Sequence, residues 1–424
     1  MIAGLVALTV IGCQGPLTTP APVVPTVTPT VPPPTPTPAP TVEPTPMIVT
    51  LELWLPEELD PYGGGSGART LGRQLSDFGD TYPNLQVEVG VKKADGRGGL
   101  IDFMRTARDA APSVLPDLVV LDASDLSTVT GSQLVRPLDD VSAFAADDDR
   151  FPFATAMGRV VDQTVGVLLG VDMQHLAYRP ALFASTPITW TDVISAPDAF
   201  LFPAGGYDGW VNDATLVQYL GAGGKLTDAE GNPSLDEQPM IDVFGFYTRC
   251  ITKTVIAPTR ALTATHVDQV WEQFKADEGA MTVVRAGRYW LEADETMAAA
   301  PIPTKNGQPL GIARGWALAI VTEDPARQEF AMLLVNWLTA PDHSALWTQA
   351  AGYLPVTRSA LRLWDVSEEE RTVLRHLLEA AVAPPRPAVM EIVGPAMQQA
   401  LESVLTGRAT PQEAAANAVR RVQR

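Results

Sequence analysis

Cysteine is nearly absent, since the 424 residues contain only Cys13 and Cys250. If Cys13 is modified, as expected below, the rest of the chain has no second thiol for an internal disulfide bond. Cys250 lies in the helix-like pattern FGFYTRCITKTVI. We therefore expect it to be a small buried apolar residue.

Catalytic and metal-binding motifs are also missing. HExxH, GxSxG and CxxC do not occur, and none of the four histidines pairs with another at helical spacing (His175, His266, His343, His376). The segment GGGSGA at residues 63–68 formally satisfies GxGxxA, but seven residues separate it from the preceding strand, where a dinucleotide fold needs a tight turn. We expect no metal, no cofactor and no enzymatic activity.

Positive charge is scarce: 30 Lys and Arg face 49 Asp and Glu, which gives a net charge of −19. With no basic patch to neutralise phosphates, nucleic acid is excluded as a partner, and so is docking of the folded body on anionic lipid. A hydrophobic content of 46% is typical of a soluble globular protein, and the length allows two or three compact units.

The N-terminal region differs from the rest. Residues 1–13, MIAGLVALTVIGC, form an apolar run too short to span a bilayer, and VIGC resembles a bacterial lipobox, whose Cys (here Cys13) is diacylated after cleavage. No Lys or Arg precedes the run, so we expect that the start codon was assigned too late. Residues 14–46 are mostly Pro and Thr, which predicts an extended tether of roughly 90 Å at ~3.1 Å per residue. A Pro-rich ligand segment and O-glycosylation are alternative roles for this tract.

From residue 47 the chain alternates between strand and helix patterns. Strands are expected at residues 48–55, 84–91, 117–121, 166–178, 280–284 and 316–321; helices are expected near residues 71–78, 100–110, 134–144, 271–274, 330–339, 367–382 and 395–405. This alternation predicts a parallel sheet covered by helices on both faces.

Charged and aromatic residues follow several of these strands. Asp122, Ser124 and Asp125 follow the strand at residues 117–121, whereas Arg285, Arg288, Tyr289 and Trp290 follow residues 280–284. Ligands of open α/β sheets bind beyond the carboxyl ends of strands, so these groups are candidates for one site. The alternative for Trp290 and Trp316 is that both are core aromatics. For the loop YDGWVND at residues 207–213, the alternative is an ordinary helix start.

The order of several blocks resembles the extracellular solute-binding proteins of ABC importers, family 1 or sugar-binding type. The blocks include LELW, FGDTYPNLQVEV, PDLVVLD, AYRPALF, FKADEGAMTVVRAGRYW, GIARGWALAIV and GYLPVTRSAL. The resemblance implies an α/β, two-lobed periplasmic-binding-protein-like fold of type II, with strands crossing the hinge. Lobe 1 would comprise residues 47–170 and 299–340, and lobe 2 residues 171–298 and 341–424.

The resemblance also implies a ligand site in the interlobe cleft. Its residues would be Trp54, Asp60, Tyr62, Asp122, Ser124, Asp125, Asp172, Tyr207, Trp210, Arg285, Tyr289, Trp290, Trp316 and Tyr353. Such a set suits a carbohydrate, because aromatic faces pack on sugar rings while carboxylates and Arg bind hydroxyls. The crossover GVDM and Arg179 depart from the family pattern, so a peptide-like or anionic ligand bound by Arg285 and Arg288 stays open.

The expected function is capture of a small solute by a monomeric lipoprotein on the extracellular face of the bacterial membrane, for delivery to ABC permease subunits. One alternative is an exported glycan-active enzyme that uses Asp122 and Asp172 as its carboxylate pair. Another is a sensor or adhesion lipoprotein with the same fold.

Overall fold

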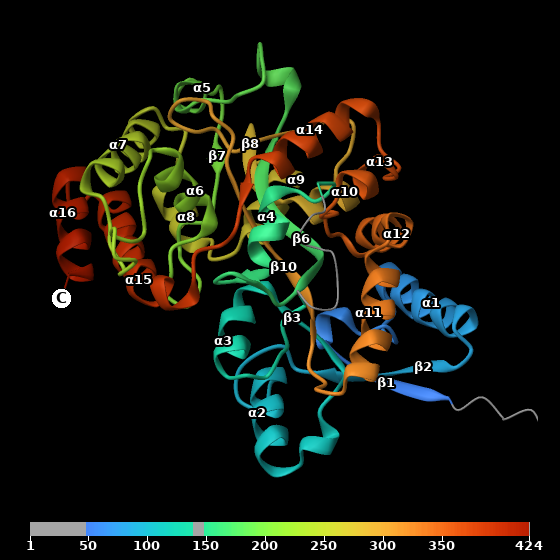
Figure 1. Cartoon of the computed structure of the whole chain (residues 1–424). Coiled ribbons are helices and arrows are strands. Elements are labelled where there is room, and N and C mark those ends of the chain that lie inside the picture. Colours follow the sequence, from blue (N-terminus) through green and yellow to red (C-terminus); the bar gives the residue numbers. More distant parts are fainter. Residues whose placement is uncertain (1–47, 139–147, 424) are drawn as a thin grey trace, which may run out of the picture. The chain divides into compact units, whose positions relative to one another are not determined.

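The computed structural model describes residues 48–138 and 148–423 (Figure 1). Cys13, the tether and the second half of the helix expected at residues 134–144 lie outside the described residues. No helix in the described part is both long and apolar enough to cross a membrane.

The first lobe is built on a sheet whose two faces are covered by different helices. Strands β2 (Leu85–Lys92), β1 (Val49–Pro56) and β3 (Leu118–Asp122) are parallel, as expected. Successive side chains point to opposite faces, so Leu118 and Val120 pack with α1 (Ser66–Thr81) and α11 (Pro325–Thr339). Val119 and Leu121 pack instead with α2 (Leu100–Ala110), α3 (Leu126–Gly131) and α4 (Pro152–Met157).

Two long strands connect this lobe with the second one. Strand β6 (Val167–Tyr178) pairs with β10 (Gly311–Ile320) through residues 167–173, and through residues 174–178 with β8 (Met281–Arg285) and β9 (Ala298–Ala300). Strand β10 likewise has Ile312 in the second-lobe core and Ala313 in the first-lobe core. These are the expected hinge-crossing strands.

The second lobe combines β8, β9 and β7 (Phe200–Leu201) with its own set of helices. They are α5 (Trp190–Ile194), α6 (Asp213–Gly221), α7 (Glu237–Thr252), α8 (Pro258–Thr263), α9 (Val267–Lys275), α10 (Ala286–Glu292), α15 (Pro387–Leu405) and α16 (Pro411–Val422). Cys250 is fully buried in α7, which confirms the expectation for this residue.

Several expectations differ from the structure. The sheet is not wholly parallel: β10 runs antiparallel to β3, because the chain returning from the second lobe enters the sheet at the edge where β3 ends. Residues 341–424 were expected in lobe 2, yet α12 (Pro341–Ala351), α13 (Arg358–Arg362), α14 (Glu368–Glu379) and β11 (Ala381–Val382) share core clusters with first-lobe strands. Helix α15 begins at Pro387 and contains Pro395, where we expected its start. Burial of Val389, Met390 and Val393 stabilises this N-terminal extension of about two turns.

Candidate functional site

A cavity of about 770 Å³ lies beyond the carboxyl ends of the first-lobe strands. Glu58 follows β1, Asp95 follows β2, and Asp122, Ser124 and Asp125 follow β3. These groups come together because parallel strands end at the same edge of a sheet.

The opposite wall belongs to the second lobe, and the crossing strands supply the residues between the two walls. Tyr207 and Trp210 lie on the loop between β7 and α6 and form part of this wall. Asn212, Asp213, His266 and Met390 complete it, while Gln174 of β6 and Arg314 and Trp316 of β10 also line the cavity. Residues from both lobes therefore surround one space.

The acidic corner of the cavity is formed by Asp122 and Asp125. The Asp122 carboxylate accepts a hydrogen bond from the backbone N–H of Ser124 at 2.8 Å, which fixes the turn after β3. Burial raises the pKa of Asp125 to about 6, and the negative charges of Asp122 and Asp95 add to the shift. Among the described residues, none donates a hydrogen bond to the Asp125 side chain. Its oxygens are free to accept one from a ligand.

The guanidinium that lines the cavity is already paired. Arg314 Nε donates to Asp213 Oδ2 at 2.7 Å and its Nη2 donates to Oδ1 at 2.8 Å, a bidentate pair that ties β10 to the start of α6. The Nη1 atom takes no part in this pair, so it can still donate to a ligand hydroxyl.

The aromatic groups are held by specific contacts. Trp316 Nε1 donates to the Tyr353 hydroxyl at 2.8 Å, and the Tyr353 ring stacks on Trp347 with centroids 5.4 Å apart. Tyr207 contacts the ring of His266 at 4.6 Å and is 57% exposed, so most of its face is open. Trp210 is half-buried against the second-lobe core. The rings are therefore oriented by the protein before any ligand arrives.

Three expected site residues from the first strand and its loop lie elsewhere. Trp54 is 6% exposed, with Lys92 Nζ 4.9 Å from its ring and Phe103 at its edge. The Asp60 carboxylate accepts a hydrogen bond from the backbone N–H of Tyr62, whose side chain is 76% exposed. Asp60 and Tyr353 line a neighbouring pocket of about 440 Å³, which shares Glu58 with the main cavity.

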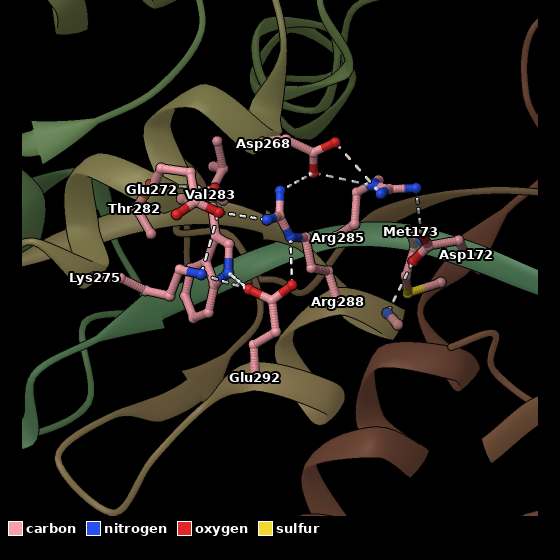
Figure 2. A network of polar contacts seen from close by, with 12 residues as sticks. Asp172, Met173, Asp268, Glu272, Lys275, Thr282, Val283, Arg285, Arg288 and Glu292 are labelled. Carbon is pink, nitrogen blue, oxygen red and sulfur yellow. Dashed lines mark hydrogen bonds and ion pairs between the residues drawn. The ribbon is translucent and has the colours of Figure 1, made fainter. Parts of the chain in front are cut away.

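The arginines that follow β8 are engaged in an internal network (Figure 2). Arg285 contacts Asp268 at 3.2 Å, whereas Arg288 pairs with Asp268, Glu272 and Glu292. Although partial burial acts in the other direction, hydrogen bonds from Lys275 and Arg288 hold the pKa of Glu292 at about 2. Neither arginine lines the cavity, so Arg285 and Arg288 would not bind an anionic ligand placed there.

Asp172 belongs to the same region (Figure 2). Its Oδ1 accepts hydrogen bonds from the backbone N–H groups of Met173 and Gly287, and Arg285 lies 3.7 Å from its Oδ2. Burial raises the pKa of Asp172 to about 6, against the opposing charge of Arg285. Asp172 thus fastens β6 to the start of α10. Of the two carboxylates that a glycan-active enzyme would use, Asp122 lines the cavity and Asp172 does not.

Tyr289 and Trp290 line a second cavity of about 640 Å³, together with Ile302 and residues of α14 such as Val373. Both rings also pack on the fully buried His175, with centroids 5.0 and 5.2 Å away. Trp290 contacts the cores of both lobes. The structure therefore does not bring Trp290 and Asp122 into one cavity.

The expected set omitted several lining residues, among them Gln174, Asn212, Asp213 and Arg314. A sequence signal exists for one of them. Arg314 precedes Trp316 by two residues in a strand pattern, and residues two apart in a strand share one face. The partner of Arg314, Asp213, is 101 residues away in sequence, and no local pattern links the two.

Several solved structures have a fold similar to that of this chain. The fold is similar to maltose-bound MalE3 of T. maritima (TM-score 0.67, 19% identity, covering 88% of this chain and 99% of that one). It is also similar to the sugar-binding protein MalE of Xanthomonas citri (TM-score 0.71, 21% identity, 88% and 96%) and to the cyclic alpha-maltosyl-1,6-maltose binding protein of Arthrobacter globiformis (TM-score 0.70, 18% identity, 88% and 98%). The sequence pattern of bacterial extracellular solute-binding proteins matches residues 77–371. The chain belongs to this family of bacterial extracellular solute-binding proteins.

Proposed function

We propose that the protein captures a carbohydrate in the 770 Å³ cavity, without altering it, and delivers it to an ABC permease. The observation that carries the proposal is the joint lining of this cavity by rings and carboxylates from both lobes. Trp210 and Tyr207 lie on one side and Asp122 and Asp125 on the other, with Trp316 between them.

The chemistry of the lining suits a sugar. Aromatic faces pack against the apolar C–H faces of a pyranose, and carboxylates accept hydrogen bonds from its hydroxyl groups. The volume falls within the range of roughly 300–1,000 Å³ that is common for small-molecule sites. The structural relatives, which are maltose-bound, cyclic maltosyl-maltose-binding and sugar-binding proteins, favour the same class.

The crossing strands support capture by hinge closure. Because β6 and β10 contribute to both lobes and also line the cavity, a solute bound there touches both halves at once. The closed form would present the surface that a permease recognises. Lipid attachment at Cys13 and the tether of residues 14–46 would keep this monomer on the extracellular face of the membrane.

Binding can be tested directly by calorimetry and thermal unfolding with mono- and oligosaccharides. A solute at 100 times its Kd should stabilise the native state by about 2.7 kcal/mol and raise Tm accordingly. The Trp210→Ala variant should show a clearly smaller shift at the same solute concentration, whereas Asp80→Asn, a change at an exposed position outside the cavity, should keep the full shift. If no sugar raises Tm, the carbohydrate proposal is wrong.

A further inference from the structure

We propose that the solute carries a positive charge and belongs to the amino sugars, with its ammonium group held between Asp125 and Asp122. This inference rests on the proposed function and names the ligand class of the same cavity.

The first step is the charge balance of the lining. Of the described residues around the cavity, five are acidic (Glu58, Asp95, Asp122, Asp125, Asp213), one is an arginine and none is a lysine. Arg314 is neutralised by Asp213 through its bidentate pair. Asp122 also interacts with the Arg314 charge, but the lining still has four more carboxylates than guanidinium groups.

The second step concerns Asp125, whose side chain receives no hydrogen bond from the described residues. Its carboxylate is partly buried and lies close to the charges of Asp122 and Asp95, with Arg105 as the opposing cation. Burial and repulsion make the empty corner unfavourable for a second ionised carboxylate, and the raised pKa of about 6 reflects this. An ammonium group placed there would relieve the repulsion and give Asp125 the hydrogen-bond donor that the protein does not supply.

The third step is the presence of rings beside this corner. Trp316 pairs with Asp122 across the β3–β10 ladder, so the two residues are neighbours in adjacent strands. Trp210 and Tyr207 lie on the second-lobe wall of the same cavity. Rings attract cations through their negative faces and also pack on sugar C–H groups, so a sugar with an amine satisfies both features.

The same arrangement disfavours anionic sugars. A uronic acid or a sugar phosphate would meet a lining with four more carboxylates than guanidinium groups, and the one lining guanidinium is already shared with Asp213. Like charges in a partly desolvated cavity repel strongly.

The test compares matched sugars that differ only at carbon 2. Calorimetry with the full chain at pH 7 uses glucose, glucosamine and N-acetylglucosamine, together with their β-1,4-linked trimers. A charge-assisted hydrogen bond predicts that the amine binds roughly 10- to 100-fold more tightly than the hydroxyl or acetamide form. Raising NaCl from about 0.05 to 0.5 M should weaken the amine more than the neutral sugars.

Two variants locate the effect. Asp125→Asn should reduce the preference for the amine over the hydroxyl and acetamide forms to within about threefold, whatever its effect on the affinity for neutral sugars. Asp80→Asn, which removes the same charge from an exposed position outside the cavity, should leave the preference intact.

The outcomes distinguish a failure of the amino-sugar inference from a failure of the carbohydrate proposal. Equal affinity for glucose and glucosamine forms overturns the amino-sugar inference but leaves carbohydrate capture standing. Spermidine, a polycation without a sugar ring, binding as tightly as the best amino sugar would overturn both the amino-sugar class and the carbohydrate proposal. If no amino sugar binds, the inference is wrong, and the wider sugar panel decides whether the function is wrong as well.

Discussion

Protonation of His175 should be the main source of acid sensitivity in the hinge region. This residue lies on β6, is fully buried, and contacts the rings of Tyr289 and Trp290. Its Nδ1 donates to the Leu176 carbonyl at 2.8 Å, and its Nε2 is buried with no partner among the described residues. A proton on Nε2 would place a charge in an apolar site.

The expected size follows from the pKa. Burial lowers the pKa of His175 from 6.5 to about 4, although the Leu176 carbonyl acts in the other direction. For a group whose folded pKa is depressed, the stabilisation is present above the unfolded pKa and is lost as pH falls through the folded one. Between pH 7 and about 4.5, protonation of this residue should lower the free energy of unfolding by about 2 kcal/mol.

The contribution of Asp172 to the pH dependence of stability has the opposite sign to that of His175, so the two contributions must be measured separately. Its folded pKa of about 6 lies above the ordinary 3.8, so its contribution is greatest at low pH and is lost as pH rises through 6. The wild-type curve alone would therefore show a partial cancellation, and a comparison of variants is needed.

The assay is urea unfolding of the wild type and of His175→Asn at pH 7 and at about 4.5. Asparagine can still donate to the Leu176 carbonyl but does not titrate, and the volume it removes destabilises the protein equally at both pH values. The stability difference between wild type and variant should shrink by about 2 kcal/mol at the lower pH. An unchanged difference would show that His175 is not the group responsible.

Further predictions concern packing, ion pairing and binding. Trp210→Ala should weaken solute binding by about 1–3 kcal/mol in calorimetry, the scale of aromatic stacking. Gly287→Ala should destabilise the protein by more than about 3 kcal/mol in urea, because the new Cβ would overlap the carbonyl oxygen of Gly352, the residue that follows α12. Gly64→Ala, with open space around it, should change stability by less than about 0.5 kcal/mol. Asp117→Ala should cost about 2–3 kcal/mol by the same measurement, because Arg327 and the backbone N–H of Glu52 lose their acceptor.

Local patterns in the sequence predicted most strands to within a few residues. The helix at residues 100–110 agrees with α2, and the strands at residues 117–121 and 280–284 are each displaced by one residue. The two-lobed fold and the family are confirmed. Helix ends were harder to predict, since the first two turns of α15 are stabilised by tertiary burial that no local signal reveals.

The site was only partly predictable. The end of β3 and the loop before α6 do border one cavity, which is lined by Asp122, Ser124, Asp125, Trp210 and Trp316; their role in binding stays a prediction. The arginines and aromatic residues at the end of β8 and in α10 do not line this cavity. Their position after a strand in the sequence does not reveal on which side of the crossing strands α10 lies. The carboxylates that form ion pairs with Arg285 and Arg288 come mainly from α9 and α10. They could not be found by looking only at the residues that follow strands.

The passage of β6 and β10 through both cores also has a consequence for folding. The first lobe is complete only after residues 311–382 have been synthesised, although its first strand begins at Val49. No contiguous fragment of the chain consists of one whole lobe alone, so neither half should survive as an excised domain. Limited proteolysis within these strands should release no stable half, and calorimetric melting should show one cooperative transition.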